Sequence, residues 1–330
     1  MKIPLLLVAL SGLAAPLHAA DNTPAIPPSG VIGVTDAQLS PEFWIGRASA
    51  PDEVLMTKAA IAAQNAKVLH RDTSMYDIAS LPSKLGAEQV KGWITRLSKR
   101  PDDPLHDVHG QEVPASDLDA WDRNLALDAV PPSQPTRYGL IVRRADLRTF
   151  PTTTRVFDEP GDTDIDRFQE SGIFPGTPVV IAHQSRDGQW LFVVSPRYAA
   201  WVKRDAVAAG SKEDVFGYVD RKPYRVVTGA HVQTVFTPEQ PRVSQLELNM
   251  GVRVPLAQGL PPDQPVNGQT AYTSYTIELP VRNDDGSLKT VPALLQRNAD
   301  SAADYLPLTR ADIIRQAFKF LGERYGWGHA

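Results

Sequence analysis

The sequence predicts an α+β fold, in which a helical N-terminal part precedes two small β-barrels and a final amphipathic helix. Three observations carry this prediction. Apolar residues recur at helical spacing before residue 130, short apolar strands separated by turn residues follow after residue 136, and a capped helical pattern begins at Thr309. A chain of 330 residues with 42% hydrophobic and 22% charged residues is long enough for several small globular domains.

The first twenty residues have the pattern of a secretory signal peptide. Lys2 supplies a positive charge, residues 3–16 form an apolar run too short for a comfortable membrane span, and Ala19 or Ala20 offers a small-residue cleavage point. The sequence contains no cysteine for lipid attachment. We therefore expect a periplasmic or secreted protein with no membrane span after cleavage.

Helices are expected between residues 21 and 135, after a proline-rich leader at residues 21–33. The first should start near residues 49–52 and bury a face that contains Val54, Leu55, Ile61, Ala62, Val68 and Leu69. Two more are expected at residues 87–98 and from Ser116, with Trp93 and Trp121 on their apolar faces and thus in the core. A linker is expected at residues 131–135 because three of its residues are proline.

A polar loop at residues 102–109 has two interpretations. It brings His106 and His109 close to three aspartates, as a metal site would. It is also bounded by proline and lacks a helix that would fix ligand directions, so a solvated turn is the favoured interpretation.

Strands are expected from residue 138 onwards. Residues 178–183 and 189–194 are predicted to form a hairpin around Asp187-Gly188, and residues 198–202 a third strand. Strands this short and closely spaced indicate a small barrel of the SH3 type. A second set is expected at residues 217–219, 224–227, 252–256, 273–281 and 287–295, the last two joined by a hairpin.

This pattern resembles bacterial SH3 domains, in which a valine-rich strand, a glycine-tryptophan hairpin and an aromatic-tryptophan-valine strand lead into a short helical turn. The matching elements are Val179 to Ile181, Gly188-Gln-Trp190, Tyr198 to Val202 and Asp205-Ala-Val207. Residues 143–151 also resemble the lead-in of NlpC-type enzymes that carry two such domains. The second strand set is then a second bacterial SH3 domain by resemblance.

The last twenty residues resemble the start of the peptidase domain of the same NlpC-type cysteine peptidases, which cut between D-glutamate and a diamino acid in peptidoglycan stem peptides. Thr309 caps a helix with Ile313, Ala317 and Leu321 on one face, Gly322 ends it, and Tyr325-Gly-Trp327-Gly follows. The resemblance implies that Tyr325 and Trp327 line the substrate groove. The alternative is an ordinary amphipathic helix.

The chain ends before any counterpart of the nucleophile. Because it contains no cysteine, and the family's catalytic histidine has no match either, we expect this chain to be inactive as such a peptidase. The domain order follows from the resemblance: signal peptide 1–20, helical stabilising domain 21–135, first SH3 domain 136–210, second SH3 domain 211–305 and truncated peptidase start 306–330.

Candidate ligand-binding residues in the first SH3 domain are Tyr198, Arg144, Asp146 and Arg148. By resemblance, this domain walls the active site and admits short wall peptides, so the expected partners are stem peptides or muropeptides. The arginines could equally form surface ion pairs, and Trp190 and Trp201 could equally be core.

Three functions follow from these observations. The first is the front part of a murein endopeptidase, and the second is a stand-alone periplasmic protein that binds wall peptides without cutting them. The third, a serine or metal hydrolase that uses His183 or His106, has no supporting motif. No cofactor is expected, and a net charge of -4 argues against nucleic-acid binding.

Overall fold

The computed structural model describes residues 30–261 and 263–324 and confirms the α+β class. The predicted signal peptide, Tyr325 and Trp327 lie outside these residues. Six α-helices are described: α1 (Pro41–Ile45), α2 (Lys58–Arg71), α3 (Ala87–Leu97), α4 (Ala115–Asn124), α5 (Lys212–Asp220) and α6 (Arg310–Phe318). No helix in this described part is both long enough and apolar enough to cross a membrane.

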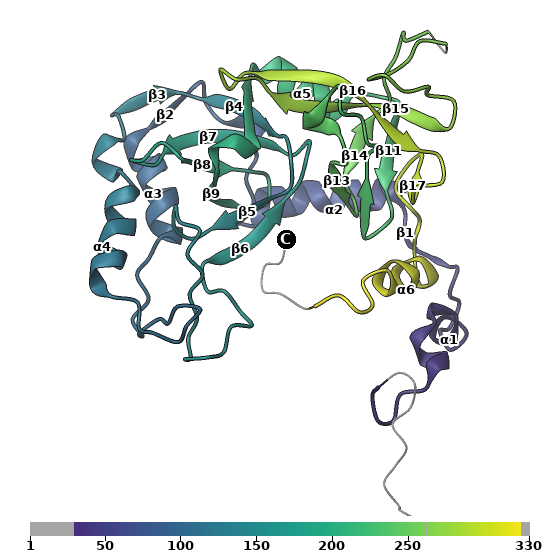
Figure 1. The fold of residues 1–330 in the computed structure, drawn as a ribbon, viewed down its shortest axis with the longest axis horizontal. Helices are drawn as coiled ribbons and strands as arrows, with labels where there is room; N and C mark the ends of the chain where they lie inside the picture. The colour runs from purple at the N-terminus through teal and green to yellow at the C-terminus, as the bar shows by residue number, and fades with distance from the viewer. Residues whose placement is uncertain (1–29, 262, 325–330) are drawn as a thin grey trace, which may run out of the picture.

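The strands divide into one large sheet and several small ones (Figure 1). The large one, called the first sheet, has the order β10-β4-β7-β8-β9-β5-β6. Its strands are β4 (Arg137–Ile141), β5 (Ala145–Arg148), β6 (Gln169–Ile173), β7 (Pro178–Gln184), β8 (Trp190–Val194), β9 (Ala199–Lys203) and β10 (Val207–Gly210). All of its pairings are antiparallel, as expected for a small β-domain built from hairpins.

The predicted hairpin of the first sheet is present. Strands β7 and β8 pair from Val180 with Val194 to Gln184 with Leu191. Gly188 has a φ of +69°, a left-handed conformation that glycine adopts without strain, and its N–H donates to the carbonyl of Ser185 at 3.0 Å. The sequence signal for this turn was therefore correct.

The first sheet is buried on both faces. One face forms a cluster of its own around Ile141, Val193 and Val202, and the other packs against the helical part through Phe192 and Trp201. Consequently β7 and β8 are buried almost continuously and show no alternation between buried and exposed residues. The helical part and the first sheet share one hydrophobic core.

The second β-region, residues 224–302, packs around a separate core that includes Val254, Ile277 and Leu295. Three small sheets enclose it, with the orders β14-β11-β17, β12-β13 and β15-β16. Their strands are β11 (Tyr224–Val227), β12 (His231–Gln233), β13 (Glu247–Asn249), β14 (Arg253–Pro255), β15 (Ser274–Arg282), β16 (Leu288–Gln296) and β17 (Ser301–Ala302). Whether this region is a second SH3 domain stays a prediction.

The long β15–β16 hairpin joins the two parts. It reaches from the second β-region to the edge of the first sheet (Figure 1), where the N–H of Ala209 donates to the carbonyl of Gly286 at 2.9 Å. Leu288 packs closely over Gly210, where an added Cβ would lie 2.9 Å from the leucine side chain. The two β-parts are therefore in direct backbone and side-chain contact.

Three local predictions were wrong. The first helix does not start at residues 49–52: strand β1 (Val54–Met56) comes first, and Thr57 caps α2 with its hydroxyl. The linker at residues 131–135 instead forms β3 (Ser133–Pro135), paired with β2 (Lys84–Gly86). Residues 217–219 belong to α5, where Ser211 caps the first turn, and not to a strand.

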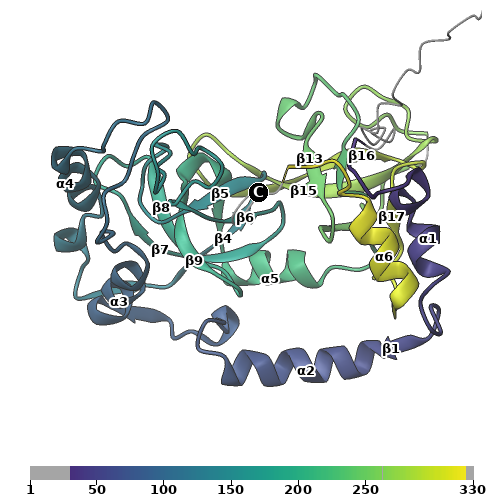
Figure 2. The same ribbon diagram turned by 90° about the horizontal axis from the view of Figure 1, so that it is seen from below.

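Helix α2 runs along one edge of the molecule, between β1 and the part that contains α3 and α4 (Figure 2). Most of its side chains are exposed, so the expected buried face is absent. Five alanines among its fourteen residues explain why it remains helical, because alanine has the highest intrinsic helix propensity.

The N-terminal arm, residues 36–58, packs against the last helix. Strand β1 pairs with β18 (Leu308–Thr309), and α1 lies beside α6 in both views (Figures 1 and 2). The backbone N–H of Ala311 donates to the carbonyl of Pro51 at 2.9 Å, and Lys58 forms an ion pair with Asp304 at 2.5 Å. The two ends of the described chain are thus held together.

The predicted N-terminal cap of α6 is present, but the predicted apolar face of this helix is not buried. The hydroxyl of Thr309 accepts from the N–H of Asp312 at 3.0 Å. The predicted end at Gly322 is wrong, because the helix ends at Phe318 with Lys319 as its C-cap, and Gly322, with a φ of +91°, lies in the turn that follows. Ala311 is fully buried, whereas Ile313 and Leu321 are 47% and 57% exposed. The arm covers one side of the helix and leaves the predicted face open.

Candidate functional site

Arg148 is a structural residue by its contacts. Its side chain, at the end of β5, is 5% exposed and pairs with Asp166 at 2.5 Å. Its remaining donors bond to the carbonyls of Thr152 and Thr154 and to the side chain of Gln169. These contacts fix the long β5–β6 connection, which is a role different from the predicted contact with a ligand.

Arg144 reaches out of the first sheet to the second β-region. Its Nη1 lies 3.5 Å from Oε1 of Glu247, and its Nε is buried without a hydrogen-bond partner in the described part of the chain. Asp146, two residues further along the chain, is exposed and accepts a hydrogen bond from Gln169 at 3.3 Å. The two residues therefore sit in different surroundings, and their predicted binding roles stay predictions.

Tyr198, one of the predicted site residues, lines a cavity. Its hydroxyl donates to Oε2 of Glu170 at 2.5 Å, and the other carboxylate oxygen of Glu170 accepts from Thr149. Burial, together with this bond to a carboxylate, raises the pKa of Tyr198 above its ordinary value, so the phenol stays protonated. Ser195 fixes the turn before it, because its hydroxyl accepts from the N–H groups of Arg197 and Tyr198.

The cavity at Tyr198, called the tyrosine cavity, lies between the first sheet and the second β-region. Its volume is about 650 Å³, which falls in the range of small-molecule sites. Its walls are mainly apolar or aromatic, and they come from β5 and β6, the turns at residues 174–178 and 195–198, helix α5, residues 250–253 and Tyr305. Aromatic planes beside apolar walls suit sugar faces and small peptide side chains.

Two further tyrosines line this cavity and differ in their exposure to solvent. Tyr218 is buried and donates to the carbonyl of Glu278 at 3.1 Å, so it supports the wall. Tyr305 is 51% exposed and comes from the segment before α6, where the sequence predicted no site residue. The available sequence signal for it was a tyrosine in a loop segment, two residues before Pro307.

Trp190 and Trp201, which the sequence left undecided between core and ligand contact, are core residues. They are 4% and 0% exposed. The indole N–H of Trp201 donates to the hydroxyl of Ser98 at 3.1 Å, which in turn donates to the carbonyl of Thr149. A chain of hydrogen bonds thus ties the end of α3 to the first sheet.

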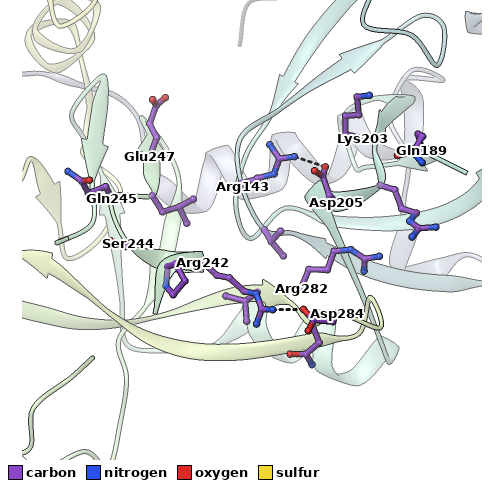
Figure 3. A pocket seen from close by; sticks show the side chains of 16 residues that line it. Arg143, Gln189, Lys203, Asp205, Arg242, Ser244, Gln245, Glu247, Arg282 and Asp284 are labelled. Atoms are coloured by element: carbon purple, nitrogen blue, oxygen red, sulfur yellow. Dashed lines mark hydrogen bonds and ion pairs between the residues drawn. The ribbon is translucent and has the colours of Figure 1, made fainter. Parts of the chain in front are cut away.

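A second cavity, called the arginine cavity, opens between the two β-parts on another side. It has a volume of about 870 Å³, and charged side chains from both parts are among its lining. Figure 3 shows Arg143, Lys203 and Asp205 of the first part facing Arg242, Arg282 and Asp284 of the second, with two ion pairs drawn. These pairs join Arg143 to Asp205 at 2.5 Å and Arg242 to Asp284 at 2.6 Å.

A charged cluster connects the segment after α6 to both β-parts. His231 on β12 lies between two carboxylates, with Nδ1 3.0 Å from Glu247 and Nε2 3.2 Å from Glu323. Burial alone would lower the pKa of His231, but the bonds to these carboxylates outweigh it and raise the pKa. Arg324 forms a further ion pair with Asp164 of the first part.

The loop that could have held a metal is a turn. The N–H groups of His109 and Gln111 donate to the carboxylate of Asp107, and His106 pairs with Phe157 through the backbone. His183, the other histidine considered, is buried and within 3.1 Å of the carbonyl of Ala126. Among the described residues, no three His, Asp or Glu side chains are grouped to hold a metal ion.

Comparison with known proteins supports the SH3 interpretation. The sequence pattern of SH3 domains of the SH3b1 type matches residues 155–203, which include β6 to β9 of the first sheet. The chain therefore contains an SH3 domain of this type. No curated protein matches the chain by sequence.

A solved structure extends the likeness to most of the chain. The NlpC/P60 endopeptidase from Photobacterium damselae subsp. piscicida is similar with a TM-score of 0.64 and 15% sequence identity, over 86% of this chain. The similar region spans 62% of the endopeptidase. The resemblance to SH3-containing NlpC-type proteins is thus confirmed in the SH3 domain and in the fold.

Proposed function

We propose that this chain is the substrate-recognising part of a peptidoglycan endopeptidase and that it binds wall stem peptides without cleaving them. The observation that carries the proposal is the tyrosine cavity, whose lining includes Tyr198 of the SH3 domain. The fold shared with an NlpC/P60 endopeptidase supports the connection to wall peptides.

The residues present support binding and not acyl transfer. A cysteine peptidase needs a thiolate, and the sequence contains no cysteine. The tyrosine cavity offers the rings of Tyr198 and Tyr305 for stacking, while Ser171 and Arg197 add polar contacts at its lining. Arg197 is exposed and positively charged, so it is suited to a D-amino-acid carboxylate.

The domain division at residues 21–135, 136–210, 211–305 and 306–330 forms part of this proposal, as does a periplasmic or secreted location. Exported surroundings are where wall peptides occur. The shared core of the helical part and the first sheet supports a stabilising role for the helices, since Trp93 and Ile94 of α3 lie in the same cluster as Trp201.

The second candidate is a stand-alone binding protein. It is favoured by the fact that residues 147–305 alone supply the whole described lining of the tyrosine cavity. The intact mass of the native protein from its source cells separates the two candidates. A mass larger by a small domain, about 100 residues, supports the endopeptidase, and a mass that matches this chain less its signal peptide supports the stand-alone protein.

Calorimetry with diaminopimelate-containing muropeptides tests the binding itself. We expect weak binding and no hydrolysis by the full chain. Tyr305→Ala should weaken binding by about tenfold, because aromatic contacts add about 0.5–1.5 kcal/mol beyond burial. Tyr272→Ala is the matched control, since Tyr272 is a 77% exposed tyrosine of the second β-region and does not line the cavity.

Two results would contradict the proposal. One is the absence of heat at millimolar muropeptide with folded protein. The other is equal binding by the Tyr305→Ala and Tyr272→Ala variants. Hydrolysis that persists through stringent purification would refute the non-catalytic role separately.

A further inference from the structure

The arginine cavity has a local charge opposite to that of the chain. Five cationic side chains line it, Arg143, Lys203, Arg204, Arg242 and Arg282, against the three acidic side chains Asp205, Glu247 and Asp284. The whole chain carries a formal net charge of -4. A positive excess concentrated in one cavity of an acidic protein indicates a site for negative charge.

Three of these cations, Lys203, Arg204 and Arg282, form no ion pair within the described residues, and the ammonium of Lys203 lies instead 4.2 Å from the centre of the Trp190 ring. Arg143 and Arg242 are already paired with Asp205 and Asp284. In contrast, neither Arg204 nor Arg282 has a carboxylate within 4 Å anywhere in residues 30–261 and 263–324. Hydrogen bonds from Ser287 lower the pKa of Asp285, and Arg282 adds only a small contribution, since the two side chains form no ion pair.

Glu247 cannot neutralise these two arginines, because its carboxylate is already engaged. It accepts from Asn249 at 2.8 Å, lies 3.0 Å from His231 and 3.5 Å from Arg144. The positive excess at Arg204 and Arg282 is therefore available to a ligand.

The backbone around the cavity has two positions with a left-handed φ, Gln245 and Gly286. Gln245 lines the cavity with a φ of +50°, a left-handed conformation that a non-glycine residue adopts only when its surroundings hold it there. The guanidinium of Arg282 lies directly over Gly286, where an added Cβ would come within 2.2 Å of Nη1. Only glycine at this hairpin turn permits that position of Arg282.

We propose that the arginine cavity binds a small ligand with two or more oxyanion groups, held between Arg204 of the first part and Arg282 of the second. Guanidinium groups form charge-assisted hydrogen bonds with carboxylates and phosphates alike. A volume of about 870 Å³ accommodates a ligand of drug-like size. Because its walls come from both β-parts, the ligand would also join them.

The test measures ligand-induced thermal stabilisation of the full chain in a buffer free of phosphate and polycarboxylates. The probes are inorganic pyrophosphate and tricarballylate, so that the two arms separate a phosphate source from a carboxylate source. A ligand that binds the folded state raises the melting temperature in proportion to its saturation. We expect stabilisation by at least one probe, with a strong dependence on ionic strength.

Variants locate the binding. Arg282→Gln should weaken it by about tenfold, since the variant loses a charge-assisted hydrogen bond, and Arg204→Gln should act similarly. Arg96→Gln removes an exposed charge on α3, away from the cavity, and should leave binding unchanged.

Stabilisation by neither probe would overturn the proposal, and so would binding that the Arg204→Gln/Arg282→Gln double variant retains. Neither Arg204 nor Arg282 lines the tyrosine cavity, so a negative result here leaves the muropeptide proposal unaffected.

Discussion

Replacing Arg148 with methionine should destabilise the first sheet and the helical part strongly. Arg148 and Asp166 form an ion pair whose side chains are 5% and 9% exposed. Removal of one partner of a buried pair leaves the other charge uncompensated and typically costs about 3–5 kcal/mol. Asp166 would keep its bonds from the N–H groups of Val156 and Phe168, so we expect a loss near the lower limit, about 3 kcal/mol.

Denaturant unfolding followed by tryptophan fluorescence is the assay. Trp93, Trp190 and Trp201 lie in the core that the helical part shares with the first sheet, so their emission reports on this unit. The matched control is Arg167→Met, which breaks an exposed pair with Asp158 in the same β5–β6 connection. Exposed pairs contribute about 0–1 kcal/mol, so its effect should be small.

The double variant Arg148→Met/Asp166→Asn tests the mechanism. It removes both charges, and it should therefore be more stable than Arg148→Met alone. A loss below about 1 kcal/mol for Arg148→Met, or a loss equal to that of Arg167→Met, would refute the assignment of Arg148 as a structural residue.

Two further predictions concern other hydrogen-bonded groups. Ser98→Ala should cost about 1–3 kcal/mol in the same assay, because the buried N–H of Trp201 loses its partner, whereas Ser74→Ala at an exposed turn should stay within about 0.5 kcal/mol. Comparable losses for both serines would contradict this. NMR titration should give His231 a raised pKa that falls in Glu323→Gln and not in Glu88→Gln, a control on α3. Because the folded-state pKa is raised, the stabilisation is present below the ordinary histidine pKa and is lost as pH rises through the folded value. An unchanged pKa in Glu323→Gln would show that the contact is not made in solution.

Local signals in the sequence were sufficient for several elements of the fold. The spacing of apolar residues predicted α3 and α4, and Asp187-Gly188 predicted the turn between β7 and β8. The hydroxyl of Thr309 predicted the start of α6. Each of these elements depends on residues that are close together in the sequence, within one helical turn or one hairpin, so the local sequence is sufficient to predict it.

The failed predictions depend on contacts between distant segments. Residues 54–56 became strand β1 because β18, some 250 positions later, supplies the pairing partner. Residues 133–135 became a strand because β2 lies alongside. Burial of β7 and β8 on both faces depends on the helical part, and the sequence pattern of the strands themselves does not show which elements cover them.

Among the candidate site residues, Arg144, Asp146 and Arg148 are close in sequence but have three different surroundings. Arg148 points into the core region of the β5–β6 connection, Arg144 reaches Glu247, and Asp146 is exposed. The role of a charged residue depends on which residue its side chain contacts in the folded protein. Those partners lie 18 and 103 positions away, where spacing rules do not apply.

The position of Tyr305 at the tyrosine cavity depends on contacts from several parts of the molecule. The next residue back, Asp304, binds Lys58 of the N-terminal arm and the hydroxyl of Tyr224 in the second β-region. Beyond α6, Lys319 pairs with Asp300, while Glu323 and Arg324 reach His231 and Asp164. Each exposed pair is weak alone, but together they restrain the same segment from both ends. The N-terminal arm therefore affects the proposed binding site without touching it, because it helps to hold the segment that carries Tyr305.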